Sequence, residues 1–151
     1  LHHDMWGFPT TDPAAVHDLM HHLNDKIEQR AEELASCRSF GLEDAEVLLI
    51  SYGSAARSAR ALTEERRIGG YKIGILELET LWPFPKQLIR EVCRDREAVI
   101  VAEMNTGQIH AQVRNAVSDP GRVYLANRID GQFIRPRDIN QVMRIVQGAG
   151  V

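Results

Sequence analysis

Short apolar runs alternate with more polar segments along most of this chain, and the alternation predicts its fold. The runs are rich in Val, Ile and Leu without strict alternation of apolar and polar positions, which is typical of parallel strands covered on both faces. We expect strands at 46–51, 72–78, 98–102 and 122–126. We expect helices at 54–67, 86–94, 108–118 and from Pro136 to about residue 147. Strands that alternate with helices predict a three-layer α/β/α domain with a mostly parallel sheet.

A long helix is expected ahead of this repeat. Asp12-Pro13 combines a favourable N-cap side chain with a proline at the first helical position. Apolar residues then recur on one helical face: Val16, Leu19, Met20, Leu23, Ile27, Leu34 and Ala35. The pattern predicts a helix of about 20 residues, or about 30 Å, a length that suits contact with a neighbouring domain or subunit.

These patterns divide the chain into two parts. Residues 1–35 are predicted to form an N-terminal linker and the long helix, with 1–11 irregular. Residues 36–151 are predicted to form the α/β domain. Within it, segment 36–41 is equally compatible with a helix end and with a short edge strand.

Composition narrows the possible partners. The chain has 151 residues and a net charge of −3 with both signs scattered along it, which argues against a nucleic acid or an anionic membrane as partner. No apolar run approaches the roughly 20 residues that span a bilayer. Cys37 and Cys93 are expected to be reduced and buried, as in a cytoplasmic protein. Two cysteines alone cannot hold a four-thiolate iron–sulfur cluster or a structural zinc ion.

The segment Tyr52-Gly53-Ser54 follows the first predicted parallel strand and opens a helix. Such a turn can bind phosphate through backbone N–H groups, with Arg57 one helical turn further on. Neither a Gly-x-Gly-x-x-Gly nor a Walker-type motif is present. The structural alternative is that Gly53 permits a tight turn and Ser54 is the helix N-cap.

The loop Leu81-Trp-Pro-Phe-Pro85 places two aromatic side chains on a segment stiffened by proline. Trp82 and Phe84 therefore suit a contact with another protein. Alternatively, both rings fold back over the end of the sheet.

Two further loops carry polar residues at the ends of strands. Glu103, Asn105 and Gln108 occupy positions where an α/β enzyme can hold a general base or an orienting amide. In the structural alternative, Asn105 or Thr106 caps the next helix and Glu103 pairs locally. Arg128 and Asp130 lie in a turn, where they could pair with each other or Arg128 could hold an anion.

Other chemical signals are weak. His17 and His21 share a helix face and could chelate a metal, but a solvated face is favoured because metal sites need three or four ligands. Ser54 lies outside a Gly-x-Ser-x-Gly motif. We therefore assign no catalytic, cofactor-binding or metal-binding residue.

Several blocks, taken in order, resemble one family. They are His3-Asp4, Gly7-x-Pro9-Thr10-x-Asp12-Pro13, Asp44-Ala-Glu-Val, Tyr52-Gly-Ser-x-x-Arg57, Leu81-Trp-Pro-Phe-Pro85, Glu103-Met-Asn-x-Gly-Gln108 and Asn127-Arg-x-Asp-Gly131. Together they are similar to the carboxyl-terminal part of the alpha subunit of 2-oxoacid:ferredoxin oxidoreductases, closest to the 2-oxoglutarate type. The resemblance covers nearly the whole chain.

The resemblance implies a fold like the transketolase carboxyl-terminal domain, with a five-stranded sheet and one antiparallel edge strand, for which residues 36–40 are the candidate. It also implies an enzyme that converts a 2-oxoacid, coenzyme A and oxidised ferredoxin to an acyl-CoA, carbon dioxide and reduced ferredoxin. In the family, thiamine diphosphate, Mg and iron–sulfur clusters are held mainly by the beta subunit and by the alpha subunit's amino-terminal domain.

We therefore expect a domain that assists assembly, is inactive alone and binds no cofactor alone. Its expected partners are the beta subunit and the amino-terminal domain, which would precede Leu1, and it would meet ferredoxin only through the full complex. The interface or ligand-edge candidates are Gly53, Ser54, Arg57, Trp82, Phe84, Glu103, Asn105, Gln108, Arg128 and Asp130. The alternative is a free-standing phosphate- or nucleotide-binding module that uses Gly53, Ser54 and Arg57.

Overall fold

A mostly parallel sheet forms the centre of the computed structural model, which describes residues 2–62 and 67–149. Its strands run in the order β3 (Cys37–Phe40), β6 (Tyr71–Leu78), β4 (Val47–Tyr52), β7 (Ala98–Glu103) and β8 (Val123–Asn127). All pairs are parallel except β3 with β6. The predicted five-stranded sheet with one antiparallel edge strand is confirmed, and segment 36–41 contains that strand.

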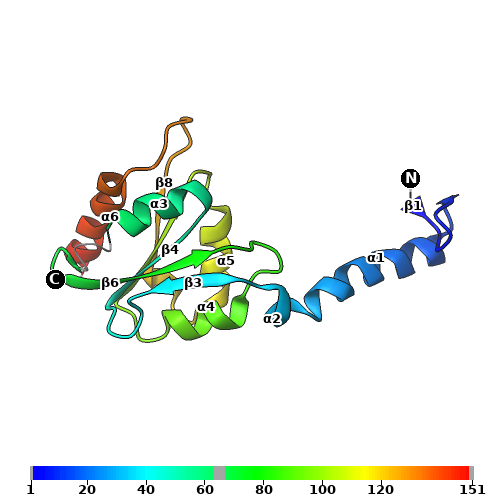
Figure 1. Cartoon of the computed structure of the whole chain (residues 1–151), viewed down its shortest axis with the longest axis horizontal. Coiled ribbons are helices and arrows are strands. Elements are labelled where there is room, and N and C mark those ends of the chain that lie inside the picture. The colour runs from blue at the N-terminus through cyan, green and yellow to red at the C-terminus, as the bar shows by residue number, and fades with distance from the viewer. Residues whose placement is uncertain (1, 63–66, 150–151) are drawn as a thin grey trace.

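Helices cover both faces of the sheet and complete three layers (Figure 1). Helices α3 (Gly53–Ala61) and α6 (Pro136–Ala149) pack on one face, and α4 (Lys86–Cys93) and α5 (Gln108–Ala116) pack on the other. A short 3₁₀ turn, η1 (Pro120–Arg122), precedes β8. Among the described residues, no helix is both long enough and apolar enough to cross a membrane.

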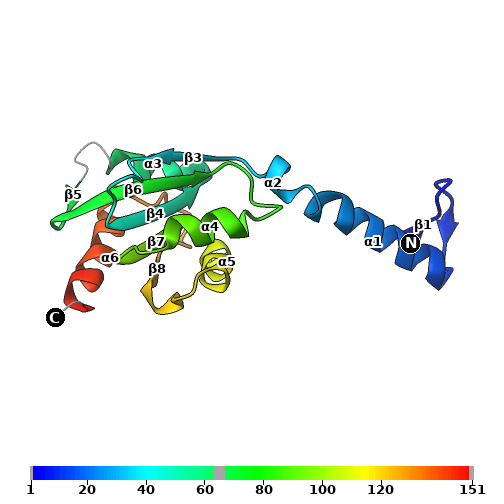
Figure 2. The ribbon, with the colours of Figure 1, turned by 90° about the horizontal axis from the view of Figure 1, so that it is seen from below.

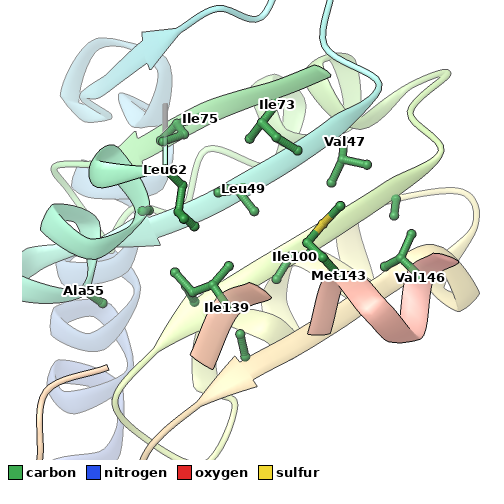
Figure 3. Packing of buried hydrophobic residues seen from close by; sticks show 14 of the residues in the cluster. Val47, Leu49, Ala55, Leu62, Ile73, Ile75, Ile100, Ile139, Met143 and Val146 are labelled. Carbon is green, nitrogen blue, oxygen red and sulfur yellow. The ribbon is translucent and has the colours of Figure 1, made fainter. Parts of the chain in front are cut away.

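The apolar strands explain the two cores. Side chains alternate between faces along a strand, so Val47 and Leu49 join the core under α3 and α6 (Figure 3), while Leu48 and Ile50 join the core under α4 and α5. All four side chains are fully buried. The continuous apolar runs in the sequence are therefore the two faces of one sheet.

An arm of residues 2–34 projects from this body (Figure 2). It contains a small hairpin of β1 (His2–His3) and β2 (Pro9–Thr10), then α1 (Pro13–Glu28) and α2 (Ala31–Leu34). As predicted, Asp12 is the N-cap of α1, and its Oδ2 accepts a hydrogen bond of 2.9 Å from the N–H of Ala15. No residue of α1 is buried.

Two predictions about the arm were wrong. Residues 2–10 are not irregular, because they form the hairpin. The long helix also breaks after Glu28, where Arg30 leaves helical geometry with φ −113° and ψ 20°. The Arg30 guanidinium then pairs with Glu33 in the short second helix, with an Nη2–Oε1 distance of 2.6 Å.

The helix predicted at 54–67 is also shorter than expected. It ends at Ala61, and the described chain resumes in β5 (Arg67–Ile68), which pairs antiparallel with the start of β6. Gly69 and Gly70 join the two strands with φ values of 59° and 92°. Such a two-residue turn with positive φ is typical of a β-hairpin. The segment 63–66 lies outside the described residues.

Candidate functional site

The strand order creates one special place at the carboxyl edge of the sheet. From β4 the chain crosses to β6 on one side, and from β6 it crosses back to β7 on the other side of β4. The helices after β4 and β7 consequently lie on opposite faces. Open α/β sheets bind their ligands in the crevice at such a switch point. Here the residues that border it are Tyr52, at the end of β4, and Glu103, at the end of β7.

Glu103 is fully buried and is satisfied by the chain itself. Its Oε2 and Oε1 accept hydrogen bonds of 3.0 Å each from the backbone N–H groups of Ile109 and His110, in the first turn of α5. Tyr52 donates its hydroxyl proton to Oε2 at 3.3 Å. The local pairing that the structural alternative foresaw for Glu103 is therefore present.

Asn105 completes this network. Its Oδ1 accepts from the N–H groups of Gly107, the N-cap of α5, and of Gln108, the first helical residue, at 2.8 and 2.9 Å. Its Nδ2 donates to the Tyr52 hydroxyl at 2.5 Å. Asn127 Nδ2, from the neighbouring β8, donates to the Asn105 backbone carbonyl at 2.8 Å. Burial, together with the Glu103 carboxylate, raises the pKa of Tyr52, so this hydroxyl stays protonated.

The network determines what this edge can bind. The N-terminus of α5 would be a ready anion site, but the Glu103 carboxylate and the Asn105 amide oxygen already accept the N–H groups of its first turn. The α5 side of the switch point is therefore closed by the protein's own acceptors. The same network holds the ends of β4, β7 and β8 together.

The Gly53 turn lies beside this network and is open to solvent. Gly53 has φ +55°, as a tight turn requires. Ser54 and Arg57 are exposed. The N-cap position falls on Tyr52, not on Ser54 as the structural alternative held, and no side chain bonds to the helix there.

The loop from Leu81 to Pro85 places its two aromatic side chains in different environments. Phe84 is half-buried against the core under α4 and α5. Trp82 remains 58% exposed, and its Nε1 donates to Glu28 Oε1 of the arm at 3.2 Å. Phe84 thus folds back over the sheet end, while Trp82 connects body and arm.

Arg128 and Asp130 pair with each other, which answers the question that the sequence left open. Arg128 Nε and Nη2 donate to the two carboxylate oxygens of Asp130 at 3.0 and 2.7 Å. Arg128 Nη1 also lies 3.4 Å from Asp138 Oδ2. The Arg128 guanidinium lowers the pKa of Asp130 to about 2. Arg128 therefore stabilises the loop between β8 and α6 and is not available to bind an external anion.

The donor side chains in the part of the chain that the structure describes do not fit a metal or an iron–sulfur cluster. Among the described residues, no three His, Cys, Asp or Glu side chains gather in a possible metal site. Cys37 and Cys93 are free and half-buried, less enclosed than predicted. Burial raises the pKa of both thiols, that of Cys93 to about 12, which disfavours the thiolate that a cluster needs. The His17 and His21 rings contact each other on the exposed helix, with centroids 4.3 Å apart.

A basic hollow of about 350 Å³ lies at the opposite, amino edge of the sheet. Two of its arginines serve the fold, since Arg90 donates to the carbonyl of Ala116 and Arg96 to that of Val92. These carbonyls end helices α5 and α4, where cations satisfy unpaired acceptors. Helix capping therefore accounts for these two arginines of the hollow.

Sequence reasoning missed Tyr52 and Asn127 as members of the carboxyl-edge network. Both are the last residues of their strands and are followed by loop residues. A polar side chain at that position is the signal that could have identified them, because the carboxyl ends of parallel strands meet at one edge.

Fold and edge together define a class: an α/β domain of the transketolase carboxyl-terminal type in which the protein's own side chains occupy the start of α5 at the switch point. Residues 45–139 match the family described as Pyruvate:ferredoxin oxidoreductase core domain II. The chain belongs to this family.

Curated relatives agree with this family. The chain is 32% identical over 145 residues to 2-oxoglutarate synthase subunit KorA of Methanothermobacter marburgensis, covering 95% of this chain and 39% of the relative. It is 34% identical over 127 residues to ketoisovalerate oxidoreductase subunit VorB of the same organism, covering 84% and 36% respectively. The chain thus spans about two fifths of the length of these relatives.

Solved structures agree as well. A 2-oxoglutarate:ferredoxin oxidoreductase from Magnetococcus marinus, with 2-oxoglutarate, coenzyme A and succinyl-CoA bound, superposes with a TM-score of 0.75 at 25% identity, covering 97% of this chain and 26% of that one. A split-gene transketolase superposes with a TM-score of 0.51 at 19% identity, covering 74% of this chain and 41% of that one, and shows the fold alone.

Proposed function

We propose that this chain is the carboxyl-terminal domain of the alpha subunit of a 2-oxoacid:ferredoxin oxidoreductase of the 2-oxoglutarate type, and that its work is assembly. The parent enzyme would use thiamine diphosphate with Mg, iron–sulfur clusters and coenzyme A, all held outside these residues, and would reduce ferredoxin in the cytoplasm. The beta subunit and the amino-terminal part of the alpha subunit would be its direct partners.

One observation carries the assembly role. On the α5 side of the crevice where α/β folds hold their ligands, Tyr52, Glu103 and Asn105 bond to each other and to the start of α5. A domain whose crevice carboxylate is already bound by its own backbone contributes a stable surface and not a catalytic group. The chain also matches only 39% of the length of a relative named as a 2-oxoglutarate synthase subunit.

The experiment compares the isolated chain with the assembled oxidoreductase that contains it. With 2-oxoglutarate, coenzyme A and a ferredoxin or viologen acceptor, we expect turnover from the assembly and none from the isolated chain. Calorimetric titration of the isolated chain with ATP, thiamine diphosphate or coenzyme A should give no saturable heat. Turnover by the isolated chain would overturn the proposal, and tight nucleotide binding would instead support a free-standing binding module at Gly53, Ser54 and Arg57.

A further inference from the structure

Most of the large apolar side chains that stay exposed in the described residues lie on the arm and on the carboxyl-edge loops. Large apolar residues that remain exposed on the arm are Met5, Trp6, Phe8, Met20, Leu23 and Leu34. Those on the carboxyl-edge loops are Leu81, Trp82, Met104, Ile129 and Phe133. Elsewhere in the described chain this group contains only Phe40, Leu88 and Ile145. Scattered single exposures are ordinary on a soluble protein, whereas a gathering of this size marks a contact surface.

The arm and the edge loops belong to the same side because of β3. This strand runs antiparallel to β6, so its first residue, Cys37, lies opposite Leu78 at the end of β6. The arm therefore leaves the sheet at the carboxyl edge, as Figure 2 shows. The hydrogen bond from Trp82 to Glu28 joins the two parts of the surface.

We propose that the arm and the carboxyl-edge loops form one composite docking surface for a single folded body, the part of the alpha subunit that this chain does not contain. The inference rests on the proposed function and deepens it by naming the partner and the residues that receive it. The partner contacts apolar side chains of both segments.

The size of the surface supports a full interface. A stable interface needs about 800 Å² from each partner, and each buried aromatic side chain supplies about 150–250 Å². Trp6, Phe8, Trp82 and Phe133 are between 58% and 76% exposed. Together with the aliphatic and polar residues around them, the arm and the edge loops offer an area of this order.

The lengths of the related chains support the choice of partner. The superposition on the Magnetococcus marinus oxidoreductase covers 97% of this chain. Residues from 36 onward make up a smaller share of the chain, so the superposed part includes the arm. The arm therefore has a counterpart inside a chain of which this sequence is only 26%. A second copy of this chain is a poorer occupant, because pairing two arms through their apolar stripes would leave Ile129 and Phe133 uncovered.

Oxidative footprinting with hydroxyl radicals tests the surface, since Met, Trp, Phe, Leu and Ile side chains are labelled in proportion to their exposure. In the isolated chain we expect strong labelling of Trp6, Met20, Met104 and Phe133. In the assembled oxidoreductase we expect all four to be protected together, while Ile145, at 60% exposure on α6, keeps its labelling. Protection of the edge with an arm that stays labelled would overturn the inference, although the assembly and the proposed function would stand.

Paired variants test whether one body covers both parts. Met20→Ser with Leu23→Ser alters the arm, Ile129→Ser with Phe133→Ser alters the edge, and Ile145→Ser is the matched control. All these side chains are exposed, so circular dichroism should show intact folds. Either pair should weaken assembly at least about tenfold, a change of 1.4 kcal/mol, and remove protection at the other part as well. Independent loss of the two protections, or protection of the arm in the isolated chain as its concentration rises, would contradict the single partner.

Discussion

At the scale of single residues, Glu103 is the side chain with the largest structural consequence. A buried carboxylate is costly unless its oxygens are hydrogen-bonded, and here three donors meet it from two elements. The same residue type in an open crevice would be a candidate general base. Burial and saturation of its acceptors make it a structural residue in this chain.

Replacing Glu103 by Gln should therefore destabilise the fold. The amide keeps the shape but turns one acceptor into a donor, which faces the N–H of Ile109 or His110. We expect a loss of about 1–3 kcal/mol in the free energy of unfolding, measured by urea denaturation. The exposed Glu97→Gln serves as the control and should change stability little. Equal stability of the two variants would show that Glu103 is not the acceptor described.

The Arg128–Asp130 pair gives a prediction on pH. In the folded chain the pKa of Asp130 is about 2, below its ordinary value of 3.8. The ion pair with Arg128 therefore stabilises the fold fully at pH above 3.8. This stabilisation is lost as the pH falls through about 2. Arg128→Gln should move the Asp130 titration midpoint up towards 3.8, as followed by NMR of the carboxyl carbon. Arg122→Gln, which removes the partner of Asp119 instead, should leave the Asp130 midpoint in place.

At the scale of elements, the sequence predicts the sheet and its covering helices because their apolar runs are long and their period is clear. Helix α4, predicted at 86–94, is observed at Lys86–Cys93. The misplaced ends have local causes. Gly69-Gly70 can end a helix or turn a hairpin, and only the pairing of Arg67 with Lys72 decides between them.

The sequence predicts where the candidate site lies, but it does not predict which partners its side chains contact. Strand ends place Glu103, Asn105 and Arg128 at the carboxyl edge, as expected. Whether Glu103 points into a crevice or onto the first turn of α5 depends on side-chain geometry, which spacing in the sequence does not encode. The same holds for Arg128, whose partner was one of two open choices.

Gly74 in β6 gives a prediction about the packing of elements. A Cβ at this position would lie 2.8 Å from the Cβ of Ala45 and 2.9 Å from the carbonyl oxygen of Gly41. Since the second contact is with backbone, Gly74→Ala should cost about 1–3 kcal/mol through overpacking, measured by thermal or urea unfolding. Gly148→Ala, with no atom within 4 Å, should be neutral or slightly stabilising. A neutral Gly74→Ala would contradict the close approach of these segments.

At the scale of the whole molecule, the body and the arm differ in the interactions that stabilise them. The two cores are built from residues between Val47 and Val146, whereas neither α1 nor α2 has a buried residue. The body therefore has the means to fold without the arm, while the arm depends on its hydrogen-bonded helix and on contacts at its base.

Removal of residues 1–34 should accordingly leave the body folded. We expect the free energy of unfolding to change by less than about 1 kcal/mol, because only exposed surface is lost. Urea denaturation followed by circular dichroism measures this, and the full 151-residue chain is the reference. Ser36 is retained, since its backbone N–H donates to Thr80 at 2.9 Å. A large loss of cooperativity would show that the arm packs on the body.

The direction of one short strand has a consequence for the assembly that we propose. If β3 ran parallel to β6, the arm would begin at the amino edge of the sheet. It would then lie beside the helix-capping arginines and away from the aromatic loops. Because β3 runs antiparallel to β6, the arm and the carboxyl-edge loops lie at the same edge of the sheet. Any domain carried by the arm is thereby held at a high effective concentration over the surface that receives it, so modest affinity suffices for a lasting association.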